Sequence, residues 1–350
     1  MIDVDVADLE WTKEGFARAA LTTPPQPPAR ITREQFAVMT ASERTAYNLA
    51  RDRWHQDLEF LDRVPQVSKN IRRLNRLIIS QPNRTSSKRG IWIDGESTLG
   101  KTALVRYVLH QLYRERTDCG ANPYQPNGNE RVPVVWLPLP ARPTLKAVNE
   151  RLSDYMNMPR MVPRAKHREE ASYELAATAA AWAVACGVEV IVIDDVQSLA
   201  NRYSDSDQTS NHIRHLMNLI PAVFILIGAD LRKDTTLLND GKPLSRSRTQ
   251  SAKRFNYMQL TAFGNRSDEE RAEWQLLLRS IEKRIIIFGD TKGALTNHAD
   301  FIHTRTGGSM GSLIGFVRDA TGIAIHEGDD VITKAVLEET DTDYASDIRS

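Results

Sequence analysis

Short apolar runs alternate with amphipathic stretches through the middle of the chain. The runs lie at residues 90–95, 132–139, 188–196 and 222–228, with a fifth at 254–260. Apolar positions at helical spacing fill the intervals 101–116, 144–156, 168–185 and 208–220. Strands that alternate with helices predict a parallel sheet that is covered by helices. The chain is therefore expected to be an α/β protein.

The segments on either side of this alternation have a different pattern. Residues 22–28 (TTPPQPP) cannot form a helix interior, because proline has no amide hydrogen and clashes with the preceding turn. Helical patterns follow an N-cap threonine at Thr32 and again at Thr40, and a basic amphipathic pattern covers 64–81. Beyond Thr261 the pattern is helical only, which predicts a small helical lid. The expected domains are an N-terminal arm (1–39), an α/β domain with N-terminal helices (40–262), a lid (263–340) and a frayed tail (341–350).

Composition narrows the possible classes of function. Of the 350 residues 41% are hydrophobic, and the formal net charge is only +1, so any nucleic-acid surface must be a local patch. Cys119 and Cys186 lie far apart, and the histidines lack metal-ligand spacing, which argues against a disulfide framework or a zinc site. The acidic N-terminal segment MIDVDVADLEW lacks the apolar stretch of a signal peptide, so none is expected, and no apolar run reaches the ~18 residues that span a bilayer. The expectation is a cytoplasmic protein without a membrane partner.

A phosphate-binding motif follows the first apolar run. Residues Gly95, Glu96, Ser97, Thr98, Leu99, Gly100, Lys101 and Thr102 match G-x-x-x-x-G-K-[ST] at every required position. The glycines let the backbone amides point at phosphate oxygens, Lys101 meets the β/γ-phosphates, and the Thr102 hydroxyl can ligate Mg²⁺. The alternative is a turn with an accidental lysine, which the strand before the motif and the helix after it disfavour. The motif predicts ATP and Mg²⁺ as ligands.

The apolar run at 188–196 ends in two acidic residues, Asp194 and Asp195. A carboxylate at the carboxyl end of a buried parallel strand lies in the crevice where α/β proteins bind ligands. Asp194 is therefore the candidate to hold Mg²⁺, and Asp195 is the candidate to polarise the attacking water. The alternative is a strand end that meets a solvated turn, which the accompanying P-loop disfavours.

An ordered set of segments resembles the TniB family. The segments are GESTLGKT, RVPVVWLPLPARPTLKAVNERLSDYMNMP, VIVIDDVQSL, LMNLIPAVFILIGAD and SAKRFNYMQL, and RTGGSMGSLIGFVRDATGIAIHEGDDVIT resembles the family's lid. TniB and its relative TnsC are AAA+ ATPases that help DDE transposases to choose targets. The resemblance covers roughly residues 40–335. It implies the AAA+ P-loop NTPase fold, ATP hydrolysis, a homo-oligomer on double-stranded DNA and a DDE transposase as partner.

Two positions depart from the family pattern, and a third feature departs from AAA+ proteins more widely. The family commonly has glutamate after the Walker B aspartate, and the shorter Asp195 here implies slow or partner-dependent hydrolysis. Ala229 and Asp230 stand where a small polar sensor residue is usual. Many AAA+ lids carry an arginine that contacts the γ-phosphate, but the lid segment GGSMGSLIGF has none, a gap that this family shares. Arg318 lies later and is better interpreted as a helix-surface residue.

A neighbouring subunit is expected to supply an arginine that stabilises transition-state charge. The candidate is Arg254, just before the fifth apolar run, and Arg246 and Arg248 are rivals. A solvated basic turn explains these residues equally well, since loop arginines are usually exposed. Head-to-tail packing through such an arginine would produce a ring or a helical filament.

Two sets of basic residues are candidates to contact DNA phosphates. The first lies before the P-loop and comprises Lys69, Arg72, Arg73, Arg76, Arg84, Lys88 and Arg89. The family resemblance points rather to Arg142, Lys146 and Arg151 after the second strand. For each of these residues taken singly, the simpler interpretation is that it lies on a solvent-exposed helix face. The tryptophans lie on apolar faces and are expected in the core rather than stacked on bases: Trp54, Trp136, Trp182 and Trp274.

Two other functions remain open on the sequence. One is a binding module in which ATP only assembles a scaffold, which the Asp195 departure favours. The other is a plasmid-maintenance or signalling P-loop ATPase without a transposase partner. ATP turnover measured with and without DNA would distinguish a binding module from an ATPase. A transposase gene beside this one would argue against the ATPase without a transposase partner.

Overall fold

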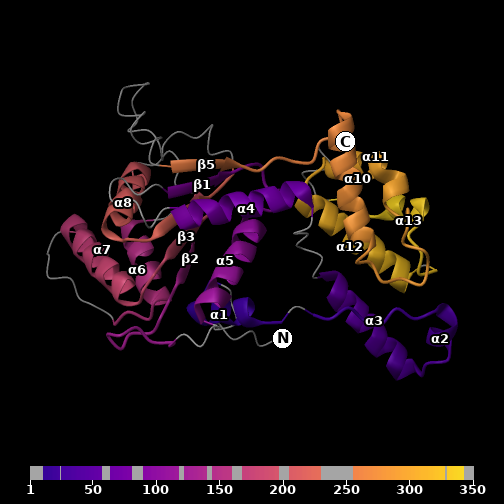
Figure 1. Ribbon diagram of the computed structural model, residues 1–350, viewed down its shortest axis with the longest axis horizontal. Helices are drawn as coiled ribbons and strands as arrows, with labels where there is room; N and C mark the ends of the chain where they lie inside the picture. The colour runs from indigo at the N-terminus through magenta and orange to yellow at the C-terminus, as the bar shows by residue number, and fades with distance from the viewer. Residues whose placement is uncertain are drawn as a thin grey trace. The chain divides into compact units, whose positions relative to one another are not determined.

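A computed structural model (Figure 1) describes ten ranges of the chain: 11–23, 25–56, 64–80, 90–117, 122–139, 144–159, 168–196, 205–229, 255–327 and 329–342. The chain divides into two compact units. The sheet unit comprises Met1–Thr22, Arg73–Glu96 and Val105–Leu260. The helical unit comprises Thr23–Arg72, Ser97–Leu104 and Thr261–Ser350.

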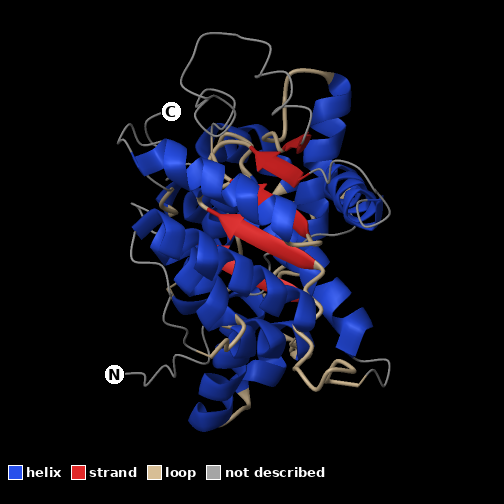
Figure 2. Ribbon diagram, turned by 90° about the vertical axis from the view of Figure 1, so that its left-hand side faces the viewer, coloured by secondary structure: helices blue, strands red, loops and turns tan. Residues whose placement is uncertain are grey.

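The sheet unit is built on five parallel strands. They are β1 (Gly90–Asp94), β2 (Val134–Pro138), β3 (Val190–Asp194), β4 (Val223–Ile227) and β5 (Phe255–Gln259). Their order is β2-β3-β4-β1-β5, and every neighbouring pair is parallel. Every residue of β1, β3 and β4 is buried, as expected for strands that are covered on both faces. The predicted parallel sheet is confirmed, and Figure 2 shows helices flanking the strands.

Helices occupy the predicted intervals between the strands. They are α5 (Lys101–Thr117), α6 (Leu145–Tyr155), α7 (Arg168–Ala185) and α8 (Asp205–Leu219), and α4 (Pro65–Ser80) precedes β1. The helices α6, α7 and α8 pack against one another, and α6 also packs on β2. Helix α5 lies between β1 and β2, α6 and α7 lie between β2 and β3, and α8 lies between β3 and β4, so helices form the connections that parallel strands require.

A helix that the sequence pattern did not predict lies inside the segment predicted as an N-terminal arm. It is α1 (Lys13–Leu21), and the side chain of its N-cap residue Thr12 accepts a hydrogen bond from the Gly15 N–H. Phe16 and Ala20 are buried one helical turn apart, and the Phe16 ring lies 5.8 Å from the Tyr113 ring of α5. These two apolar positions are the sequence signal for α1, and they make it part of the sheet unit's core.

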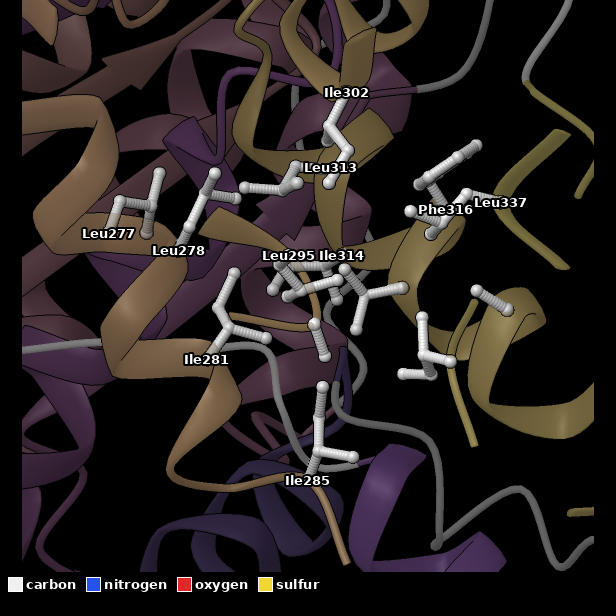
Figure 3. Packing of buried hydrophobic residues seen from close by; sticks show 14 of the residues in the cluster. Leu277, Leu278, Ile281, Ile285, Leu295, Ile302, Leu313, Ile314, Phe316 and Leu337 are labelled. Atoms are coloured by element: carbon white, nitrogen blue, oxygen red, sulfur yellow. The ribbon is translucent and has the colours of Figure 1, made fainter. Parts of the chain in front are cut away.

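The helical unit combines segments from both ends of the chain. Its elements are α2 (Arg33–Ala37), α3 (Ala41–Gln56), α10 (Asp268–Glu282), the 3₁₀ turn η3 (Thr296–His298), α11 (Ala299–Thr306), α12 (Met310–His326) and α13 (Lys334–Glu339). Figure 3 shows apolar side chains of α10, α11, α12 and α13 converging on one core. The Thr32 and Gln35 side chains form a capping box at the start of α2, as the sequence predicted.

Hydrogen bonds join α3 to the C-terminal half of this unit. The Trp54 indole donates to the Arg284 carbonyl, and the Ile286 N–H donates to His55 Nε2. Arg51, at 0% exposure, binds both carboxylate oxygens of Asp330 at 2.8 Å. Helix α2, from the segment predicted as the arm, and α3, from the segment predicted as the α/β domain, both fall in the helical unit.

Among the described residues, none of the helices combines the length and the apolar character needed to cross a membrane.

Candidate nucleotide site

The predicted site residues follow the carboxyl ends of two strands in one sheet. Asp94 is the last residue of β1 and leads into the 95–102 motif, and Asp194 is the last residue of β3. Because β1 and β3 are both parallel to β4, which lies between them, their carboxyl ends share one edge of the sheet. Ligands of open α/β sheets bind at this edge.

The backbone of the phosphate motif bends where glycine allows it. Gly100 has φ = 80° and Thr98 has φ = 65°, both in the left-handed region. A Cβ on Gly100 would meet no atom closer than 3.9 Å, so the backbone angle and not space requires glycine there. Helix α5 begins at Lys101, and its N-terminus is the positive end of the helix dipole next to the motif.

Asp94 anchors the start of the motif. Its carboxyl group is 3% exposed, accepts the Gly95 N–H at Oδ1 over 2.8 Å, and accepts the Tyr257 hydroxyl at Oδ2 over 2.7 Å. A buried polar group needs such partners to offset its lost hydration. Asp94 was not among the predicted site residues, although Ile91–Asp94 (IWID) has the same form as Ile191–Asp194 (IVID).

Asp194 and Asp195 have different surroundings. Asp194 is 8% exposed, and its Oδ1 accepts the Asp195 N–H at 3.0 Å, while its carbonyl accepts the Leu139 N–H. Asp195 is exposed and has φ = 59°, an uncommon conformation for a residue with a Cβ. A buried carboxylate beside an exposed one suits the predicted division between a metal ligand and a group that handles water.

Several predicted residues fall outside the part of the chain that the structure describes. They are Arg246, Arg248, Arg254, Asp230, Arg84, Lys88, Arg89 and Arg142, together with the Lys146 side chain. Ala229 follows β4 and is half-buried. Arg318 donates hydrogen bonds to the carbonyls of His55 and Gln56, so it holds the end of α3.

The described basic residues of the two candidate DNA surfaces are exposed. Lys69, Arg72, Arg73 and Arg76 all lie on α4, and Arg73 also donates to the Tyr257 carbonyl of β5 at 2.7 Å. Arg151 on α6 is exposed and donates to the Pro138 carbonyl at the end of β2. Trp136 and Trp274 are buried, at 5% and 1% exposure, which agrees with a place in the core.

Within the described ranges, no group of three or more His, Cys, Asp or Glu side chains is arranged to hold a metal ion. A P-loop Mg²⁺ site does not require one, because the nucleotide phosphates and water supply most of the ligands. Of the protein ligands expected here, Thr102 is the second residue of α5 and Asp194 is the last residue of β3.

Comparison with known proteins gives a family and a fold. The sequence profile of the family described as Bacterial TniB protein matches residues 48–265. The chain is similar to the Aeropyrum pernix Orc1 protein in complex with DNA, with 15% identity and a TM-score of 0.55 over 82% of this chain and 67% of that chain. It is also similar to domain III of the Thermotoga maritima replication initiation protein DnaA, with 14% identity and a TM-score of 0.46 over 82% of this chain and 95% of that chain. No curated protein matches. The likeness to Orc1 confirms the AAA+ P-loop NTPase fold.

Proposed function

Because the chain belongs to the TniB family, whose profile matches more than half of its residues, we propose that it is an ATPase that binds MgATP at residues 95–102 and acts on DNA. One observation carries the proposal: a complete G-x-x-x-x-G-K-T motif joins β1 to α5, at the sheet edge where β3 ends in the buried Asp194. Strand, loop and helix are the context in which this motif binds phosphate.

The residues present fit a nucleotide and its metal. The motif supplies main-chain amides, the N-terminus of α5 and the Lys101 ammonium, all of which attract phosphate oxygens. Gly100 adopts its left-handed angle without a Cβ, so the loop can bend around the phosphates. Thr102 and Asp194 offer the hydroxyl and carboxylate oxygens that Mg²⁺ prefers. Bound Mg²⁺ would neutralise charge that develops on the phosphates.

The proposed catalytic roles fall on two adjacent carboxylates. Asp194 holds Mg²⁺, because it is buried at the strand end and its position is fixed by the Asp195 amide. Asp195 polarises the attacking water, because it is exposed and directly follows the metal ligand. Its short side chain makes hydrolysis slow in the isolated chain.

Calorimetric titration with MgATP tests the binding step. Lys101→Ala should lower the affinity by at least about tenfold, because one charge-assisted contact to phosphate is lost. Lys334→Ala, which removes an exposed lysine on α13, is the matched control and should bind as the wild type does. Equal affinity in Lys101→Ala and wild type would overturn the proposal.

Substitutions of Asp194 and Asp195 should have different effects on ATP binding and on ATP turnover. Asp195→Asn should slow hydrolysis about 100-fold while ATP binds normally, because its role is on water. Asp194→Asn should weaken the Mg²⁺-dependent part of ATP binding. If both variants behave alike in both assays, the division of roles is wrong.

We extend the proposal to assembly on double-stranded DNA and to a DDE transposase as the partner. The family assignment supports both, and the structure of Orc1, a protein of the same fold, was determined in complex with DNA. With a net charge of +1 a single subunit makes few phosphate contacts, and repeating a weak patch along an oligomer raises avidity. Arg254 of one subunit would complete the ATP site of the next.

Sedimentation with double-stranded DNA and ATP, ADP or no nucleotide tests this extension. Assembly should require ATP, and Arg254→Ala should assemble poorly while a monomer still binds ATP. Arg246→Ala and Arg248→Ala are the comparison variants, since they remove rival arginines of the same segment. Equal assembly in all three nucleotide states would refute the model, and co-purification with a DDE transposase tests the partner.

An ATP-dependent scaffold that does not hydrolyse ATP is the second candidate. The observation that favours it is Asp195, a short carboxylate held at φ = 59° where the family commonly has glutamate. DNA-dependent assembly without phosphate release, in wild type and Asp195→Asn alike, would identify the scaffold.

A further inference from the structure

The tip of the phosphate loop is bound by the first turn of helix α12. The Thr98 carbonyl accepts the Gly311 N–H at 2.7 Å and the Ser309 hydroxyl at 2.9 Å. The hydroxyl oxygens of Thr98 and Ser309 lie 2.8 Å apart, and the Ser312 hydroxyl lies 3.5 Å from Thr98 Oγ1. Three residues of the helical unit therefore converge on one residue of the loop.

The contact depends on unusual backbone at Thr98 and on the missing side chain at Gly311. Thr98 has φ = 65°, where a β-branched residue is strained and persists only when its surroundings hold it. A Cβ on Gly311 would lie 2.7 Å from the Thr98 carbonyl oxygen and 3.3 Å from Thr98 Cα. Both of these atoms belong to the backbone and cannot move aside as a flexible side chain can. Glycine is therefore required for this approach.

Holding the Thr98 carbonyl also fixes the amide that follows it. In a trans peptide the C=O and the next N–H point in opposite directions within one plane. With the Thr98 carbonyl directed at α12, the Leu99 N–H points away from α12. In a P-loop the amides at these positions are the donors to phosphate. Donors that are oriented before the ligand arrives bind it more tightly, because less order has to be created on binding.

We propose that Ser309 and Gly311 are positioning residues of the nucleotide site, which fix the Thr98–Leu99 peptide in the orientation that receives the phosphates of ATP. The inference rests on the proposed nucleotide binding at residues 95–102. It gives the lid a part in that site through main-chain and hydroxyl contacts, although the segment GGSMGSLIGF contains no arginine.

Helix α12 provides a matched pair of glycines for the test. Gly311→Ala should lower MgATP affinity about tenfold or more, because the added methyl group pushes the Thr98 peptide away. Gly315→Ala adds the same methyl group one turn later, where no atom lies within 4 Å, and should leave affinity unchanged. Both changes replace glycine by a better helix former, so a general effect on the helix would appear in both.

Ser309 allows a change that removes the contact without removing a helix cap. Ser309 is the N-cap residue of α12, but its side chain makes no capping hydrogen bond. Ser309→Ala should weaken MgATP binding about three- to tenfold and raise KM for ATP with kcat unchanged. Ser309→Thr keeps the hydroxyl group and should restore the affinity. If Ser309 had only a structural role, Ser309→Ala would lower the melting temperature without raising KM for ATP selectively over kcat.

Hydrogen exchange of the nucleotide-free chain separates this inference from the proposed function. Gly311→Ala and Ser309→Ala should speed exchange of the amides at residues 97–102, and Gly315→Ala should not. A wild-type chain that binds no MgATP would refute the proposed function. The exchange rates still decide whether α12 orders the loop. Unchanged exchange together with unchanged MgATP affinity in both contact variants would overturn the inference.

Discussion

The buried pair between Arg51 and Asp330 allows a sharp test of how the helical unit is held together. The Arg51 side chain is 0% exposed and the Asp330 side chain 8% exposed, with Nη1 and Oδ2 2.8 Å apart. Arg51 also donates to Asn48, and its guanidinium lies 4.8 Å from the centre of the Phe288 ring. Arg51→Met keeps much of the volume of the side chain but leaves the Asp330 carboxylate buried without its cation.

The expected loss of unfolding free energy follows from that burial. Removing one partner of a buried ion pair costs about 3–5 kcal/mol, because the remaining charge has no compensation. The Phe288 N–H still donates to Asp330 Oδ1 at 3.1 Å, so the cost should lie near the middle of that range, about 4 kcal/mol. For a unit of this size the melting temperature should fall by about 10 °C.

Urea unfolding followed by circular dichroism measures the change, and the neighbouring pair of residues gives the control. Arg33 and Asp329 form an ion pair at 3.6 Å with side chains 55% and 91% exposed. Arg33→Met should cost less than about 1 kcal/mol, because solvent screens the pair. In a double-mutant cycle, Arg51→Met with Asp330→Asn should cost less than the sum of the single changes. If Arg51→Met costs no more than Arg33→Met, the reasoning from burial is refuted.

Two further predictions concern the phosphate loop and the pH dependence of stability. Tyr257→Phe removes the hydroxyl that donates a hydrogen bond to Asp94 Oδ2. The change should lower the unfolding free energy by about 1–2 kcal/mol in denaturation experiments and should weaken MgATP binding in calorimetry. Unchanged binding would exclude Asp94 as an anchor of the loop. Burial lowers the pKa of His55 to about 4, and its Nε2 accepts the Ile286 N–H. An unfolded histidine titrates near 6.5, so between about pH 6.5 and 4 the unfolded state binds the extra proton and the folded state is destabilised as the pH falls. Because of His55, the free energy of unfolding should fall by about 2 kcal/mol between pH 7 and pH 5. In urea titrations, the unfolding free energy of His55→Gln should depend less on pH than that of the wild type. An equal pH dependence in both proteins would contradict the low pKa of His55.

The sheet and its helices were predictable because their signals are local. Each central strand is a run of apolar residues buried on both faces, so β1, β3 and β4 could be located within one or two residues. The 95–102 motif has fixed spacing, and its place between β1 and α5 followed from the apolar pattern around it. Helix α1 was not predicted, because only two apolar residues, Phe16 and Ala20, form its buried face.

The remaining features depend on contacts between distant parts of the sequence, which no local pattern records. Arg51 and Asp330 are separated by 279 positions, and arginine is ordinarily an exposed residue, so nothing at position 51 indicates full burial. Thr98 and Gly311 meet from segments that the sequence assigned to different domains. The glycine at 311 was visible, but its purpose becomes clear only when the Thr98 carbonyl lies against it.

The two buried aspartates, Asp94 and Asp194, end their strands in a similar way at the same edge of the sheet. Asp94 and Asp194 each end a strand, and each accepts the amide of the residue that follows. The following residue has positive φ in both cases, 151° at Gly95 and 59° at Asp195, which residues with a Cβ rarely adopt. Glycine makes this turn without strain, whereas a side chain at Asp195 makes it less favourable. Asp195 is therefore an aspartate at a position where glycine would relieve the backbone, and strained residues cluster at ligand-binding sites, which supports the role proposed for its carboxylate.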